Sequence, residues 1–232
     1  MPLENVVFRD IQVESLRDKV VAALKDAFFS GTLKPGDMIV ERELARRMNI
    51  GTPAIREALI TLQEQGFVRR VANTATYVSE FSVDDVRQLY QLRVEFELLA
   101  LQWAKPHVTE GDLTRLEKIV TNMVEAAEKK RAREFYESDL EFHKCCWTLS
   151  RNPFLARSLE TLVTPLFAFV LNASDASVEV AVAREHLNIV NALRNLNDPE
   201  FSAVVRATLS SFALRGTSSM VAQEKTKEHR PK

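Results

Sequence analysis

The chain has 232 residues, 46% of them hydrophobic and 27% charged, and its formal net charge is −1. These values are typical of a globular protein of one large or two ordinary domains, and we favour two. No apolar run approaches the length of a membrane span, and the first residues, MPLENVVFRD, lack the features of a secretory signal, so we expect a cytoplasmic protein without membrane contact.

The first part of the chain predicts a helix followed by a short strand. Residues 13–30, VESLRDKVVAALKDAFFS, have the apolar periodicity of an amphipathic helix, and Gly31 follows as a stop signal. Lys34-Pro35-Gly36 predicts a turn, after which MIV (38–40) favours a strand.

The stretch from Glu41 to Val68 predicts two short helices joined by a tight turn. Apolar residues mark one face of each helix: Leu44, Ala45 and Met48 before the turn, and Ile55, Ala58, Leu59 and Leu62 after it. Thr52 and Pro53 are typical of an N-cap followed by proline at the first helical position. This pattern predicts a helix-turn-helix, in which the start of the second helix meets base edges in the major groove of DNA.

Local charge supports nucleic acid as the partner. Six arginines between residues 42 and 70 outnumber three glutamates there, and such a face attracts phosphates. An ordinary helical hairpin would show the same periodicity but does not require this charge. Beyond Gly66, the runs FVRRV and TYV, separated by the turn ANTA, predict a two-stranded wing.

The stretch FSGTLKPGDMIVERELARRMNIGTPAIREALITLQEQGFV resembles the N-terminal domain of the GntR family of bacterial transcription regulators. The matching positions are Gly31, Pro35-Gly36, Glu41, Leu44-Ala45, Arg56-Glu57-Ala58-Leu59 and Gly66. The resemblance implies a winged helix-turn-helix that binds operator DNA. The residues to which we assign DNA contacts are Arg42, Arg46, Arg47, Thr52, Pro53 and Arg56, together with Asn73 and Thr74 in the wing.

From Val83 the sequence predicts helices almost exclusively, with Ser82 as the N-cap of the first. The expected helices are 83–104, 110–130, 132–150, 153–171, 178–196 and 198–215. A winged domain followed by a helical domain resembles the FadR-type branch of the GntR family over residues 13–216. We therefore predict a mainly α protein: a winged helix-turn-helix at 1–80, an all-α bundle for effector binding and dimerisation at 81–216, and a disordered polar tail at 217–232.

Polar side chains on inward-facing stripes of the helical domain are candidates for a ligand site. Asp139 and His143 are four residues apart on one helical face, and His186 lies on the apolar stripe of another helix. These three side chains could hold zinc, nickel or manganese, or form a buried Asp–His hydrogen bond. The resemblance to the FadR-type branch implies that these residues belong to its metal-binding segments, where the metal helps to bind a small carboxylate. Where metal-binding members of the family usually have a third His, this chain has Thr208 or Leu209.

Arg93 also lies on an apolar stripe, where its charge needs a partner. Glu97, one turn later, is one candidate; in the resemblance, the same Arg-x-x-x-Glu pattern binds an effector carboxylate.

The sequence thus favours a homodimeric, ligand-responsive repressor that binds a two-fold operator and senses a small carboxylate. The alternatives are a metal-dependent enzyme in the helical domain, which lacks an evident general acid or base, and a constitutive DNA-binding protein with a vestigial pocket.

Overall fold

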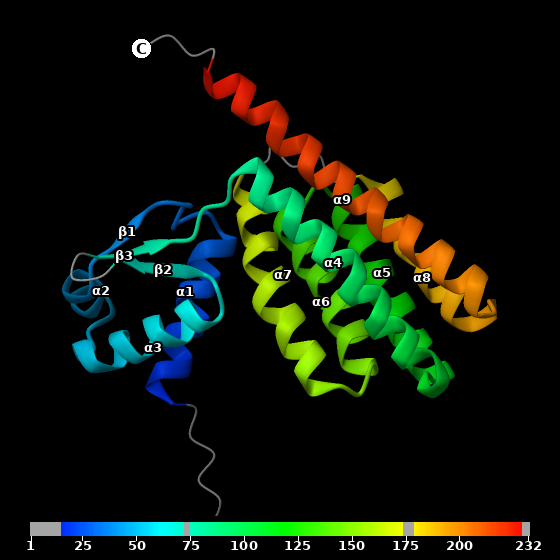
Figure 1. Cartoon of the computed structure of the whole chain (residues 1–232). Coiled ribbons are helices and arrows are strands. Elements are labelled where there is room, and N and C mark those ends of the chain that lie inside the picture. The colour runs from blue at the N-terminus through cyan, green and yellow to red at the C-terminus, as the bar shows by residue number, and fades with distance from the viewer. Residues whose placement is uncertain (1–14, 72–74, 174–178, 229–232) are drawn as a thin grey trace, which may run out of the picture.

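The computed structural model describes residues 15–71, 75–173 and 179–228 of the chain. A small sheet with short helices lies at one end of the molecule, and long helices pack into a bundle at the other end (Figure 1). The predicted fold class, a winged helix-turn-helix followed by an all-α bundle, is confirmed. Asn73 and Thr74, predicted to contact DNA, lie outside the described residues.

The N-terminal elements follow the predicted order. They are α1 (Leu16–Phe29), β1 (Met38–Ile39), α2 (Glu41–Met48), α3 (Thr52–Glu64), β2 (Val68–Val71) and β3 (Ala75–Val78). Asn49, at the turn between α2 and α3, has φ 53°, a left-handed conformation that asparagine tolerates. The predicted N-cap of α3 is one residue off, because Gly51 holds the extended cap conformation and Thr52 is already helical.

The predicted two-stranded wing is part of a three-stranded antiparallel sheet in the order β1-β3-β2. Strand β1 pairs with β3 through Met38 opposite Tyr77 and Ile39 opposite Thr76. Strand β2 pairs with the other edge of β3 through Arg69 opposite Tyr77 and Arg70 opposite Thr76. Because side chains alternate along a strand, one face of the sheet turns toward the helices and the other toward solvent.

The C-terminal helices pack around a common core. They are α4 (Val83–Ala104), a 3₁₀ turn η1 (Lys105–His107), α5 (Glu110–Glu128), α6 (Ala132–Leu149), α7 (Pro153–Ala173), α8 (Val180–Asn195) and α9 (Asp198–Glu228). Ser82 caps α4 as predicted, since its side chain accepts a hydrogen bond from Asp85 N, and its own N–H donates to the Asp85 side chain.

Helix α9 corrects the prediction for the end of the chain. It was expected to stop at residue 215, and the tail beyond 216 was expected to be disordered, but the helix continues to Glu228 and extends past the bundle (Figure 1). The sequence TSSMVAQEKTKE contains no proline and several good helix formers, so polarity alone was a poor guide to its backbone.

Helix α7 lies between the two ends of the molecule. Its Ala168 joins the apolar cluster formed by α1, α3 and the sheet, while Phe167 belongs to the cluster of the helical bundle. Gly66, directly after α3, has φ 76°, and a Cβ there would lie 3.3 Å from both Pro165 Cγ and Thr161 O of α7. The residue must therefore be glycine both for its conformation and for this close approach.

The stretch Pro153–Val170 of α7 is long and apolar enough to pass for a membrane span by length and composition, which we did not expect from the sequence. Its packing against α6, α4 and α1 is that of a core helix.

Candidate functional site

The predicted DNA contacts within the described residues are accessible. Arg42, Arg46, Arg47, Pro53 and Arg56 are exposed, and Thr52 is half-buried. The buried residues of α3 lie on its opposite side: Ile55, Ala58, Leu59 and Leu62. Helix α3 thus presents polar side chains outward, as binding in a DNA groove requires.

Two glutamates that we did not assign to the site organise these arginines. Glu43 accepts hydrogen bonds from Arg46 Nη2 at 2.8 Å and from Arg47 Nε at 2.7 Å, and these bonds lower its pKa to about 2. Glu41 Oε2 accepts a bond from Arg56 Nη2 at 3.0 Å. The contacts of Glu43 could have been predicted, because Arg46 and Arg47 lie three and four residues later on the same helix. The contact of Glu41 with Arg56 could not, because the two residues lie on different helices.

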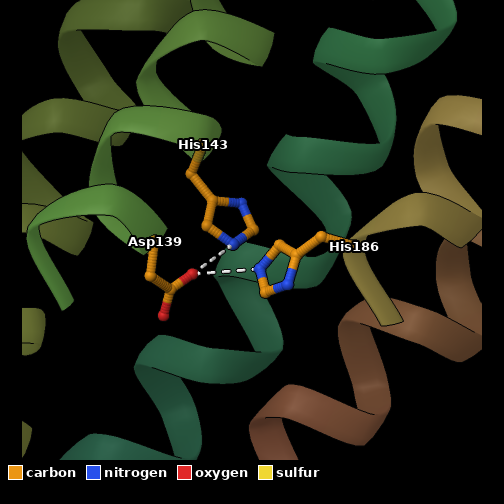
Figure 2. A group of neighbouring side chains, drawn as sticks. All are labelled: Asp139, His143 and His186. Atoms are coloured by element: carbon orange, nitrogen blue, oxygen red, sulfur yellow. Dashed lines mark hydrogen bonds and ion pairs between the residues drawn. The ribbon is translucent and has the colours of Figure 1, made fainter. Parts of the chain in front are cut away.

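In the helical bundle, the three predicted metal ligands converge on one point. Asp139 and His143 extend from α6 and His186 from α8, and one oxygen of Asp139 faces a nitrogen of each ring (Figure 2). Asp139 Oδ1 is 3.3 Å from His143 Nε2 and 3.0 Å from His186 Nε2. The three potential ligand atoms lie within 4.8 Å of one another.

The surroundings of both rings favour a cation at this point. His143 Nδ1 lies 2.9 Å from Glu97 Oε2, and His186 Nδ1 lies 3.1 Å from Val182 O. Each Nδ1 faces an acceptor, so a ring that keeps its proton there offers its Nε2 lone pair to a metal beside Asp139, whereas without a metal a proton on Nε2 donates to Asp139 Oδ1. Two imidazole nitrogens and a carboxylate oxygen are the donor set that zinc, nickel or manganese binds, so these residues fit a divalent metal.

Negative charge dominates the electrostatics of the cluster. Burial by itself raises the pKa of Asp139, but hydrogen bonds to His143 and His186 lower it more, so the net shift is downward. Burial lowers the pKa of His143, yet the charge of Glu97 and hydrogen bonds to Asp139 and Glu97 raise it above the usual value. The carboxylates therefore stabilise positive charge at the imidazole edges, whether a proton or a metal carries it.

Arg93 is buried beside the same cluster. Its Nε donates to Glu97 Oε1 at 3.0 Å, the partner that the sequence offered as the alternative to an effector carboxylate. Its Nη2 lies 2.7 Å from His143 Nε2, so Arg93 and the potential metal ligands form one site. Arg93 and His143 lower the pKa of Glu97 to about 2, although burial opposes the shift.

The predicted slot for a third His holds no strong ligand. Thr208 is buried on α9 and its hydroxyl donates to Val204 O at 3.0 Å, while Leu209 belongs to the core. One turn beyond Thr208, the Phe212 ring stacks on His186 with a centroid distance of 4.4 Å. Phe212 and Trp147, whose Nε1 donates to Glu97 at 3.2 Å, were not predicted to border the site.

Two family models match the chain. Residues 16–78 match the model "Bacterial regulatory proteins, gntR family", and residues 88–211 match the FCD domain. The chain therefore belongs to the GntR family of bacterial regulatory proteins and carries an FCD domain.

Curated relatives and solved structures agree with this assignment. The chain is 27% identical over 176 residues to the uncharacterised HTH-type transcriptional regulator YdhC of Bacillus subtilis, covering 75% of this chain and 79% of the relative. It is 26% identical over 163 residues to the HTH-type transcriptional repressor RspR of Escherichia coli, covering 70% and 72%. The structure of E. coli McbR/YncC superimposes with a TM-score of 0.76 at 21% identity, covering 91% of this chain and all of that one (100%), which supports the fold.

The chain is thus a DNA-binding transcription regulator and not an enzyme, as its family membership establishes. The alternative of a metal-dependent enzyme is set aside.

Proposed function

We propose that the protein is a cytoplasmic, homodimeric repressor whose winged domains, residues 1–80, bind a two-fold operator. Its helical domains, residues 81–216, sense a small carboxylate that releases the DNA. The observation that carries the proposal is that Arg93, Asp139, His143 and His186 meet in one buried cluster within the FCD match. The repressive mode is supported by the relative RspR, which is named a repressor.

The charges of the cluster favour an anionic effector only together with a cation. Arg93 carries one positive charge, and Glu97 and Asp139 each carry one negative charge, so these three side chains sum to minus one. A bound zinc, nickel or manganese would supply positive charge and open coordination positions that can bind a carboxylate oxygen. Arg93 has donors suited to the effector's second oxygen. Because Arg93 lies beside His143, one small acid can reach both the guanidinium group and a metal held by His143.

For DNA, we assign base contact to Arg56 and phosphate contact to Arg46 and Arg47, with Arg42, Thr52 and Pro53 beside them. Arg56 lies on α3, and the other two arginines lie on α2. We expect Arg56→Ala to reduce operator discrimination by about 1–3 kcal/mol. Arg46→Ala or Arg47→Ala should weaken binding to all sequences and lower the salt slope by about one unit. Equal affinity of Arg56→Ala and wild type for a selected duplex would remove the recognition role from α3.

The dimer follows from the small number of bases that one short recognition helix can read. A two-fold operator requires two such helices, held by a symmetric protein. We assign dimerisation to the helical domain, so residues 81–216 alone should sediment as a dimer.

The sensor is tested by a thermal-shift screen of small carboxylic acids with and without divalent metals, since binding to the folded state raises its stability. A positive acid is then titrated calorimetrically with zinc, nickel and manganese. We expect acid and metal to strengthen each other's binding. His143→Ala should abolish metal uptake and this coupling, whereas the control His107→Ala, exposed in η1, should change neither.

Two outcomes would change the proposal. If His143→Ala binds the acid as wild type does and neither takes up metal, Asp139, His143 and His186 form a hydrogen-bonded cluster and the protein senses its ligand without a metal. If no acid stabilises the protein, it is a constitutive DNA-binding protein with a vestigial pocket.

A further inference from the structure

We propose that Arg70 of strand β2 binds a backbone phosphate of the DNA beside Arg56, and that Glu41 positions both arginines before the DNA arrives. The inference rests on the proposed DNA contact through α3 and extends it to a strand residue and a carboxylate to which no DNA-binding role was assigned.

One carboxylate holds two guanidinium groups from different elements. Glu41, the first residue of α2, accepts from Arg56 Nη2 at 3.0 Å and Nε at 3.2 Å through Oε2. Its other oxygen, Oε1, accepts from Arg70 Nη2 at 2.8 Å. Arg70 therefore lies next to the arginine to which base contact is assigned, although the two are fourteen residues apart in the sequence.

The pleat of the sheet explains why Arg70 reaches this place. Arg70 pairs with Thr76, which pairs on its other side with Ile39. Thr76 and Ile39 are both buried, so this face of the sheet packs toward the helices. Arg70 extends from the same face, and its guanidinium meets Glu41 at the start of α2.

Arg69, the neighbour of Arg70 on β2, provides a contrast on the opposite face. It pairs across the sheet with Tyr77, and Met38 on β1 is exposed on this same face. Arg69 lies over the Tyr77 ring and bonds to Glu80 Oε1 at 3.1 Å. The two arginines have the same charge and similar exposure but face away from each other.

The arrangement leaves positive charge available for a phosphate. Two arginines share one carboxylate, so one positive charge remains without a countercharge in this group. The Arg56 and Arg70 side chains are 58% and 40% exposed, whereas the Glu41 side chain is only 20% exposed. Exposed ion pairs contribute little to stability, so a phosphate can replace Glu41 as the partner of Arg70 while Glu41 still orients Arg56.

The first experiment compares Arg70→Ala with Arg69→Ala in the full-length protein. The probes are a duplex enriched from a random pool by wild-type binding and a scrambled duplex of the same composition, each measured over a range of salt concentrations. We expect Arg70→Ala to bind both duplexes more weakly and to lower the salt slope by about 0.9. Arg70→Lys should keep the slope because it keeps the charge, and Arg69→Ala should behave as wild type.

A wild-type slope for Arg70→Ala, or an equal loss for Arg69→Ala, would overturn the phosphate contact. If wild type itself enriches no sequence and binds no duplex, the proposed function fails instead, so the two failures are distinguishable.

The second experiment tests the positioning by Glu41. Glu41→Gln keeps the shape of the side chain and removes its charge, and Glu43→Gln does the same beside Arg46 and Arg47. Both changes should strengthen binding to the scrambled duplex, because each removes a negative charge. Only Glu41→Gln should also lower the ratio of selected to scrambled affinity, by about 3- to 10-fold, since a misplaced Arg56 loses part of a base contact worth about 1–3 kcal/mol. Equal ratios in the two variants would show that Glu41 is a countercharge without a positioning role.

Discussion

Arg93 and Glu97 lie one turn apart on α4, and both side chains are at most 5% exposed. Glu97 accepts from Arg93 and Trp147 and also contacts His143, so one carboxylate is the shared partner of three buried side chains. Removing one member of a buried pair leaves an uncompensated charge in a medium that solvates it poorly.

We therefore expect Glu97→Gln to lower the free energy of unfolding by about 3 kcal/mol or more, measured by urea denaturation. The matched control is Glu95→Gln, two residues away on α4, which loses the exposed ion pair with Arg206 and should cost less than about 1 kcal/mol. The double variant Arg93→Met with Glu97→Leu should regain most of the stability. A similar loss in both single variants would mean that burial does not set the cost.

For individual residues, the sequence predicted the contacts that follow from spacing along a single helix. Asp139 and His143 meet because they are four residues apart on one helix, and His186 was placed inward by its apolar stripe. The contact of His143 with Arg93 and Glu97 joins α6 to α4 across about fifty residues. Such a contact depends on how two helices cross, which periodicity within each helix does not specify.

Helix α4 has an apolar stripe on its outer side. Leu92 and Trp103, three turns apart on the same helical line, are 46% and 41% exposed. Phe96 and Leu99 lie between them and are half-buried. A second copy of α4 packed antiparallel would bring Leu92 next to the partner's Trp103, which makes this stripe the face that we expect in the proposed homodimer.

We expect the double variant Leu92→Asp with Trp103→Asp to sediment as a monomer at micromolar concentrations while keeping its helical circular dichroism, because both residues are surface residues of the protomer. Phe154→Asp, which changes an even more exposed aromatic residue at the start of α7, should remain dimeric. A dimeric double variant would place the interface elsewhere.

The type and order of the helices and strands could be predicted from the sequence, but the residues at which they end were harder to predict. Ser82 marked the start of α4 because a side-chain cap is local chemistry. Strand β1 was expected, but its pairing with β3 was not, since the register of residues almost forty positions apart depends on tertiary packing. The extension of α9 was missed because polar composition was weighed above helix propensity.

Helix α7 contacts both candidate sites of the molecule. The Phe167 ring centroid lies 4.8 Å from the Arg93 guanidinium carbon and 5.9 Å from the His143 ring. Two residues earlier on α7, Pro165 approaches Gly66 at the end of α3. A ligand that displaces Phe167 therefore acts on a helix that also packs against the DNA-binding elements.

We expect Phe167→Leu to reduce the factor by which the acid weakens operator binding by about 2- to 30-fold, with the acid still bound. The measurement compares operator affinity with and without saturating acid, and acid affinity is determined separately by calorimetry. Phe212→Leu is the control, because Phe212 stacks on His186 from α9; it should change acid affinity but preserve the response of DNA binding once the acid is saturating. Equal responses in the two variants would exclude a special role for α7.

The contact at Gly66 fixes one end of α3 against α7, so a small tilt of the helix moves its other end the most. The helix has 13 residues, which at about 1.5 Å per residue makes it roughly 20 Å long, and it is anchored against α7 at the end away from Thr52. A tilt of about 5° around this anchor moves the DNA-facing end by roughly 1.7 Å at that length. Hydrogen bonds to base edges tolerate only a few tenths of an ångström, so a tilt of this size would take Arg56 out of register with the base contact that we propose for it.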